Sequence, residues 1–232
     1  MGVGAVIVPP RSYFEKIQAV LSKYEILFIA DEVICGFGRT GNMWGSQTFG
    51  IRPDIVTTAK GLSSAYLPIS AVLVNEPIYR ALVEESGKIG MFGHGFTNSG
   101  HPVCAAVALE VLKIYEERDI VGNVRSVAKT LHTGLRRLAG SPIVGEVRGV
   151  GLMAAIELVA DKQTKKPFPS ERKLGQYLAA RAQEHGLFVR AIGDSVVMAP
   201  PLIISAAEID EMLGLLGRAL SETEVAAEQW IG

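Results

Sequence analysis

With 232 residues, of which 48% are hydrophobic and 20% charged, the chain is long and apolar enough to bury a core, which excludes an intrinsically disordered protein. Its 23 basic and 24 acidic residues leave a net charge of −1 without a long run of either sign, so neither a nucleic-acid partner nor a membrane anchor is expected. No apolar run approaches the roughly 18 residues of a membrane span, and no signal peptide is visible.

The two cysteines, Cys35 and Cys104, lie in apolar segments. Free cysteines usually pack as small hydrophobic residues, so we expect both to be reduced and structural rather than paired in a disulfide. Reduced thiols favour a cytoplasmic protein.

The first part of the chain predicts a βαβ arrangement. The apolar run 5–8 stops at two prolines and predicts a strand, and a helix with apolar residues at helical spacing is expected from about Ser12. Two further runs, 26–30 and 54–59, are too short for helices and rich in Ile and Val, so they predict buried strands of an α/β sheet. A right-handed crossover is expected between the first two strands.

The segment Gly36–Gly41 matches the glycine pattern of dinucleotide-binding proteins, G-x-G-x-x-G, and follows a predicted strand. That fingerprint also needs a helix at its last glycine and an acidic residue about 20 positions later, and neither follows. The glycines therefore predict a tight loop beside a ligand, with backbone angles that only glycine tolerates well.

The middle of the chain predicts mainly helices. The expected elements are a strand at 68–74, a helix at 76–85, a flexible loop opened by Gly87 and Gly90, a helix at 102–117, and a second helix at 124–138 that Asn123 caps after a break at Gly122.

The last third predicts a smaller α/β domain. Its expected elements are strands at 142–147 and 152–159, a helix at 170–185 that ends at Gly186, strands at 187–192 and 195–199 joined by a Gly193-Asp194 hairpin turn, and a capping box from Ser205 to Glu208 before a final helix.

Asp31 and Lys60 directly follow two of the predicted strands. Ligands of open α/β sheets bind at the carboxyl ends of the strands, so both side chains are expected to face one crevice. Burial there favours the neutral amine of Lys60, a nucleophile able to form a Schiff base, although its ammonium can instead reach water. A buried Asp31 needs a cationic or hydrogen-bonding partner; otherwise it caps a turn.

Four ordered motifs give the sequence a resemblance to a known family. They are ADEVICGFGRTG at 30–41, TTAKGLS at 57–63 with its lysine 29 positions after the aspartate, GFTNSGHP at 95–102 and VRGVGLMAAIEL at 147–158. Together they resemble the class III aminotransferases, which are pyridoxal-phosphate enzymes of fold type I. The resemblance implies an α/β fold in which residues 1–120 form the C-terminal part of the cofactor-binding large domain and 121–232 form the small C-terminal α/β domain.

The resemblance also implies roles for individual residues. Lys60 would hold pyridoxal 5'-phosphate as a Schiff base and act as the catalytic base, Asp31 would pair with the pyridine nitrogen, and Val33 would pack on the ring from the same side of an extended chain. Thr97 would donate a hydrogen bond to the cofactor phosphate across a dimer interface, which implies a homodimer with shared sites. Arg190 resembles the arginine that binds a substrate carboxylate.

The substrate class is implied by a departure within the family. Ornithine-, acetylornithine- and γ-aminobutyrate-type members commonly have glutamine where this chain has Ile34, so the sequence is more similar to the branch that transfers an amino group from an ω-amino acid or amine to pyruvate. His94 and His101 lack the further ligands of a zinc site, so no metal is expected.

The family's phosphate-binding loop and the aromatic residue that stacks on the cofactor are not found in this sequence, so the chain resembles a portion that lacks the N-terminal half. Three hypotheses stay open. The chain is a transaminase, completed by a separate polypeptide or acting alone; it is an aminomutase or decarboxylase of the same fold; or it is a non-catalytic, truncated fragment that dimerises through exposed apolar surface.

Overall fold

The structure is a computed structural model that describes residues 2–231, with side chains as far as residue 229. The chain divides into two compact units. Pro10–Val121 form the first unit, and the second consists of the described residues up to Pro9 together with those from Gly122 onward. The division lies close to the predicted one at 120, but the segment before Pro10 groups with the second unit. The assignment of the two parts to a large and a small domain stays a prediction.

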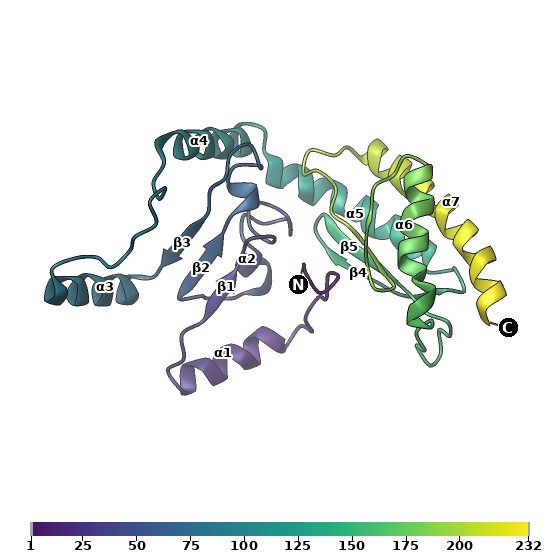
Figure 1. Cartoon of the computed structure of the whole chain (residues 1–232), viewed down its shortest axis with the longest axis horizontal. Coiled ribbons are helices and arrows are strands. Elements are labelled where there is room, and N and C mark those ends of the chain that lie inside the picture. The colour runs from purple at the N-terminus through teal and green to yellow at the C-terminus, as the bar shows by residue number, and fades with distance from the viewer. Residues whose placement is uncertain (1, 232) are drawn as a thin grey trace. The chain divides into compact units, whose positions relative to one another are not determined.

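The first unit contains a three-stranded sheet in the order β1-β2-β3 (Figure 1). Strands β1 and β2 are parallel with Asp31 opposite Thr57, whereas β3 is antiparallel to β2. The elements of this unit are α1 (Tyr13–Lys23), β1 (Ile29–Asp31), α2 (Gly45–Phe49), β2 (Ile55–Thr58), the 3-10 turn η1 (Lys60–Leu62), β3 (Ala71–Val74), α3 (Glu76–Ile89) and α4 (Pro102–Glu117). Strands therefore exist at the three predicted places. The second and third lie within the predicted bounds 54–59 and 68–74, whereas the first, predicted at 26–30, begins later and extends one residue further, to Asp31.

The predicted strand at 5–8 is wrong. Ala5 and Val6 are buried, as their apolar character suggested, but both have φ of 58°, in a left-handed region that is incompatible with a strand. The carbonyl of Ala5 accepts a hydrogen bond of 2.9 Å from Nε of Arg148, a residue of the second unit's sheet. The segment is thus buried by packing as a turn, so the expected βαβ unit with α1 does not form.

The helices after the sheet differ from the prediction in where they break. Helix α4 has the predicted bounds, with Pro102 in its first turn. Helix α5 (Ile120–Leu138) then begins before Gly122, because the chain reverses at Asp119, where φ is 43°. Asn123 lies inside α5 rather than at its start, so the predicted cap is wrong; its side-chain amide donates to the carbonyls of Leu202 at 2.8 Å and Ile204 at 3.2 Å. Helix α3 likewise runs through Gly87 and ends at Ile89, with Gly90 as its C-cap.

The second unit contains a four-stranded antiparallel sheet in the order β4-β5-β7-β6. Its elements are β4 (Val144–Val150), β5 (Met153–Leu158), the 3-10 turn η2 (Ser170–Arg172), α6 (Leu174–Glu184), β6 (Arg190–Ile192), β7 (Ser195–Met198) and α7 (Ala206–Ile231), in addition to α5. The hairpin turn at Gly193-Asp194 is confirmed by the pairing of Ile192 with Ser195. The capping box is confirmed too, because the backbone N–H of Glu208 donates to Oγ of Ser205 at 3.2 Å and the backbone N–H of Ser205 donates to Glu208 at 2.8 Å.

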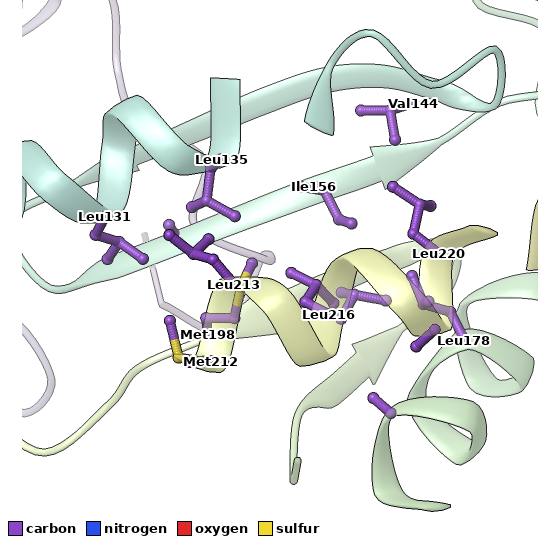
Figure 2. Packing of buried hydrophobic residues seen from close by; sticks show 14 of the residues in the cluster. Leu131, Leu135, Val144, Ile156, Leu178, Met198, Met212, Leu213, Leu216 and Leu220 are labelled. Atoms are coloured by element: carbon purple, nitrogen blue, oxygen red, sulfur yellow. The ribbon is translucent and has the colours of Figure 1, made fainter. Parts of the chain in front are cut away.

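One hydrophobic core holds the helices of the second unit to its sheet. Figure 2 shows side chains of α5, α7 and β5 pointing toward one another, with Leu135, Leu216 and Ile156 among them. Each of these three side chains is fully buried. The spacing of the apolar residues along α5 and α7 places one face of each helix on this core.

Both cysteines are free thiols, Cys35 buried and Cys104 partly buried. Within residues 2–231, no helix combines the length and the apolar character required to cross a membrane. Burial raises the pKa of the Cys35 thiol, and the negative charge of the nearby Glu32 carboxylate raises it further.

Candidate active site

The structure brings Asp31 and Lys60 to the same edge of the first unit's sheet. Asp31 is the last residue of β1, and Lys60 follows the end of the parallel neighbour β2 by two residues. The ladder between these strands continues to Glu32, whose N–H donates to the carbonyl of Thr57 at 2.9 Å. Because parallel strands end at a common edge, an acid and an amine stand at the place where open α/β sheets bind ligands.

The expectation that both side chains are buried is wrong for this chain. Asp31 and Lys60 are exposed, because each lies at or beyond the end of a short strand rather than within it. Asp31 also has the turn-capping role that was left open, since its Oδ1 accepts a hydrogen bond of 3.0 Å from the N–H of Val33. An exposed carboxylate and an exposed amine remain accessible to a ligand.

Val33 does not lie on an extended chain with Asp31, because β1 ends at Asp31 and the chain turns directly afterwards. The premise that the two residues share one side of a strand is therefore wrong. Val33 is partly buried in the turn. Its proposed packing on a cofactor ring stays a prediction.

Glu32 is a residue of this site that sequence reasoning missed. Its side chain is only 2% exposed, and its two carboxylate oxygens accept hydrogen bonds from the backbone N–H groups of Gly45 at 2.8 Å and Ser46 at 2.6 Å. These are the first two residues of α2, so the carboxylate closes the loop 32–44 that follows Asp31. Two consecutive acidic residues at the end of a strand were the available signal, since alternating side chains direct one of them inward.

The loop after Asp31 also contributes a buried aromatic and polar cluster with α4. Phe37 packs against Trp44, with ring centroids 5.1 Å apart, and edge-on against Tyr115 of α4 at 6.3 Å. Burial raises the pKa of the Tyr115 hydroxyl, and burial lowers the pKa of the neighbouring Arg39 guanidinium. Gly38 and Gly41 have φ near 90°, so the glycine-rich segment is the tight loop that the sequence predicts.

Thr97 belongs to the same unit as Asp31 and Lys60, whereas Arg190 belongs to the other unit. Thr97 is exposed in the turn between α3 and α4, and across residues 2–231 no hydrogen bond or ion pair joins it to Asp31 or Lys60. Arg190 is exposed at the start of β6, in the second unit. Among the described residues, no group of three or more His, Cys, Asp or Glu side chains could hold a metal ion.

Comparison with known proteins decides the family. The family model "Aminotransferase class-III" matches residues 1–220. The chain belongs to the class III aminotransferases. Members of this family are pyridoxal-phosphate-dependent enzymes of fold type I, which agrees with the mixed α/β content of the structure.

Curated relatives and solved structures agree with this assignment. The chain is 51% identical to gamma aminobutyrate transaminase 3, chloroplastic, of Solanum lycopersicum over 99% of its own length and 44% of the relative, and 50% identical to vanillin aminotransferase of Capsicum frutescens over 99% of its length and 50% of the relative. It superposes with a TM-score of 0.95 on the omega transaminase from Pseudomonas jessenii in complex with PMP, at 53% identity, covering 100% of this chain and 50% of that one. The chain therefore spans about half the length of the relatives it matches.

These names bear on the substrate argument drawn from Ile34. Curated relatives that are about half identical are named gamma aminobutyrate transaminases, so the contrast with γ-aminobutyrate-type enzymes does not exclude that substrate. The similarity to omega transaminases agrees with the expected branch.

The residues at the strand ends fit pyridoxal phosphate. An exposed carboxylate suits the pyridine nitrogen of the cofactor, and an exposed primary amine at the same edge suits its aldehyde. Just before the lysine, the Thr58 hydroxyl is buried without a hydrogen-bond partner among the described residues, so this edge also holds an unsatisfied polar group.

Proposed function

We propose that this chain acts in pyridoxal-phosphate-dependent transamination, moving an amino group from an ω-amino acid or amine to a keto acid such as pyruvate. The observation that carries the proposal is the position of Asp31 and Lys60 at the carboxyl ends of adjacent parallel strands in a chain of this family. Because the chain spans about half the length of its relatives, whether it is active alone is part of the proposal's test.

Three residues would hold the cofactor and move the proton. The Nζ of Lys60 would bind the cofactor aldehyde and, once released by substrate, take a proton from the substrate carbon and return it as a general base. The carboxylate of Asp31 would accept a hydrogen bond from the pyridine nitrogen and keep it protonated. Pyridoxal phosphate supplies an electron sink for the bond that breaks at the substrate carbon. Val33, in the turn after Asp31, would pack beside the ring.

Thr97 would act in a second copy of the chain. Its exposed turn between α3 and α4 leaves the hydroxyl available to a phosphate that another protomer binds. A homodimer with shared sites follows from this role. Size measurements with and without pyridoxal phosphate test the dimer; a monomer under both conditions would refute it.

Arg190 would select the substrate. An exposed guanidinium at the start of β6 can bind a carboxylate through two parallel hydrogen bonds. An ω-amino acid or a keto acid carries such a group, whereas a simple amine does not. Arg190→Lys keeps the charge but loses the planar guanidinium group, so it would weaken the binding of carboxylate substrates more than the binding of simple amines.

The two free thiols support a cytoplasmic setting. Relatives named chloroplastic and mitochondrial show that the family also works in organelles. Cell fractionation distinguishes these compartments.

The first experiment is cofactor loading. Purified chain is mixed with pyridoxal phosphate, freed of excess, scanned for visible absorbance, reduced with borohydride and mapped by peptide mass. We expect one adduct, at Lys60, which Lys60→Ala abolishes. Lys88→Ala is the matched control, because Lys88 is an exposed lysine on α3 held only by surface ion pairs.

The outcomes separate the hypotheses. An adduct confined to Lys60 supports the transaminase, and analysis of products from amine and keto acid pairs then distinguishes it from an aminomutase or decarboxylase. Adducts scattered over surface lysines, or none, refute a competent site in this chain alone. That result would favour the non-catalytic fragment, for which the exposed apolar side chains of Val72, Leu73 and Val74 on β3 provide an association surface.

A further inference from the structure

The structure leaves no room for a side chain at Gly61, the residue after Lys60. A Cβ added to Gly61 would lie 2.8 Å from the Cβ of Phe37, and the three atoms nearest to it all belong to Phe37. The φ angle of Gly61 is not in the left-handed region, so glycine is required here by the close approach of Phe37 and not by the backbone. The turn η1, which begins at Lys60, therefore contacts the side chain of Phe37 directly.

Phe37 is itself held from two sides. Its side chain is 4% exposed, and its ring packs against Trp44, the N-cap of α2, with centroids 5.1 Å apart. The ring also meets Tyr115 of α4 edge-on at 6.3 Å. The φ angle of Phe37 is 56°, in a region that residues other than glycine adopt infrequently and that persists only where surrounding contacts impose it. These contacts fix the place of the ring independently of the turn.

The loop that carries Phe37 leads back to Asp31. Within this loop the N–H of Gly36 donates to the carbonyl of Glu32 at 2.9 Å. The buried carboxylate of Glu32, the residue after Asp31, binds the loop to the start of α2. The contact between Phe37 and the turn therefore joins the segment after Asp31 to the segment that begins at Lys60.

The backbone of Lys60 makes this residue sensitive to the contact. Lys60 has φ of 41°, so it lies in the left-handed region, where the conformation depends on the surroundings. One planar peptide group joins Lys60 to Gly61, so a displacement of Gly61 reorients Lys60. The direction in which the Lys60 side chain leaves the backbone thus depends on how Gly61 packs.

We propose that Phe37 is a positioning residue for Lys60: by packing on Gly61, it fixes the turn relative to the loop after the neighbouring strand. In this way it sets the position of the Lys60 amine with respect to the Asp31 carboxylate. The link from this geometry to the cofactor rests on the proposed function, and Phe37 itself touches neither substrate nor cofactor. A side chain that only filled the core would stabilise the unit without coupling the two strand ends.

Gly61→Ala tests the coupling in the cofactor-free chain, with a readout in the other segment. Cys35 is a buried thiol of the loop after Asp31. The added methyl group should displace Phe37 and its loop, so a thiol reagent should label Cys35 about tenfold faster, the effect of crowding a packed site. A wild-type labelling rate would overturn the proposal.

Gly87→Ala is the matched control. Gly87 lies in α3 of the same unit, and a Cβ added there would meet no atom within 4 Å. The same substitution without the crowding should leave the labelling rate of Cys35 unchanged. Equal acceleration in both variants would refute the coupling.

A second background assigns the effect to Phe37. In Phe37→Gly the three atoms nearest to the new Cβ are absent, and φ of 56° suits glycine. Adding Gly61→Ala to this variant should change the labelling rate of Cys35 by less than about twofold, because the two substitutions remove one shared contact. A full tenfold effect in this background would overturn the proposal.

If Phe37→Gly does not fold, the labelling of Gly61→Ala in low concentrations of urea decides. Labelling through a local opening of the loop depends weakly on urea, because little surface is exposed, whereas labelling through unfolding of the whole unit rises steeply. Weak dependence supports the coupling. A steep rise would overturn it.

Cofactor loading tests the consequence for Lys60. Where the wild-type chain forms its adduct, Gly61→Ala should form it about tenfold more slowly with the same final absorbance, and Gly87→Ala at the wild-type rate. If Gly61→Ala does not fold, Phe37→Leu takes its place, since it keeps an apolar side chain but loses the flat ring, and the same slowing is expected. An unchanged rate, with or without a lower final absorbance, would overturn the positioning role.

The two experiments fail independently. If the wild-type chain forms no adduct, the proposed function fails for this chain alone. The labelling of Cys35 needs no cofactor and still decides whether Phe37 couples the two strand ends.

Discussion

The substitution Glu32→Gln tests how firmly the loop after Asp31 is held. Both Glu32 oxygens accept backbone hydrogen bonds in a buried site, at 2.8 and 2.6 Å. Glutamine keeps one acceptor but places an NH2 group against the second N–H, so one buried donor loses its partner and the other bond loses its charge. Bonds to charged groups contribute about 1.5–3 kcal/mol and an unsatisfied buried donor costs about 1–3 kcal/mol, so we expect unfolding to become easier by about 2–4 kcal/mol.

Two measurements report this change. Urea unfolding gives the free energy. The rate at which a thiol reagent labels Cys35 reports the loop itself, because Cys35 is a buried residue of this loop and packs against the start of α2: a Cβ on Gly45 would be 2.7 Å from the Cβ of Cys35. Cys35 should label faster in Glu32→Gln, while the partly buried Cys104 labels at its original rate.

Neutralising Glu32 also removes one of the charges that raise the pKa of Cys35, which increases its thiolate at a given pH. Labelling across a range of pH separates this effect from exposure, because a pKa change shifts the curve whereas exposure raises its plateau. Glu85→Gln on α3, whose ion pair is exposed, is the control and should change neither measurement. An unchanged unfolding midpoint together with an unchanged Cys35 plateau would refute the structural role of Glu32.

Three further predictions concern the second unit. Gly175→Ala should destabilise it by roughly 1–3 kcal/mol, because the new Cβ would lie 2.3 Å from a backbone carbonyl of the β6–β7 turn. Gly214→Ala on α7, where a new Cβ would meet no atom within 4 Å, should instead stabilise it by about 1 kcal/mol. Urea unfolding midpoints that shift in the same direction for both variants would contradict this. Leu216→Ala should cost about 2–5 kcal/mol, against less than about 0.5 kcal/mol for the exposed Leu109→Ala in the first unit, as measured by urea unfolding. Burial lowers the pKa of His132, so the free energy of unfolding should fall as pH falls through its ordinary value of about 6.5 and level off below the folded pKa; a pH profile as steep in His132→Gln would exclude this.

Local sequence signals predicted elements well where the chain's own backbone decides them. The capping box at Ser205 and Glu208, the hairpin turn at Gly193-Asp194 and the first turn of α4 at Pro102 depend on hydrogen bonds or φ restrictions within a few residues. Such interactions need no knowledge of distant neighbours. Their predicted positions were accordingly confirmed.

The errors arose where distant contacts decide the structure. Val6 is apolar and β-branched, yet it is buried in a left-handed turn. The carbonyl of the preceding residue, Ala5, accepts a hydrogen bond from Arg148, which lies 143 residues further along the chain. Asn123 resembles a helix cap, but carbonyls near residue 203 accept its amide. Asp31 and Lys60 were placed correctly at strand ends, whereas their exposure depends on how far short strands extend. No local pattern contains this information.

The two residues proposed to hold the cofactor are fixed by different physical means. The loop after Asp31 is held by the Glu32 carboxylate, through charge-assisted bonds to two backbone N–H groups, and the turn that begins at Lys60 packs against α4. Phe37 joins the two, because its ring meets Tyr115 while its Cβ leaves no room for a side chain at Gly61. The acid and the amine are therefore positioned by one packed cluster within the first unit, and a substitution in that cluster should disturb both strand ends together.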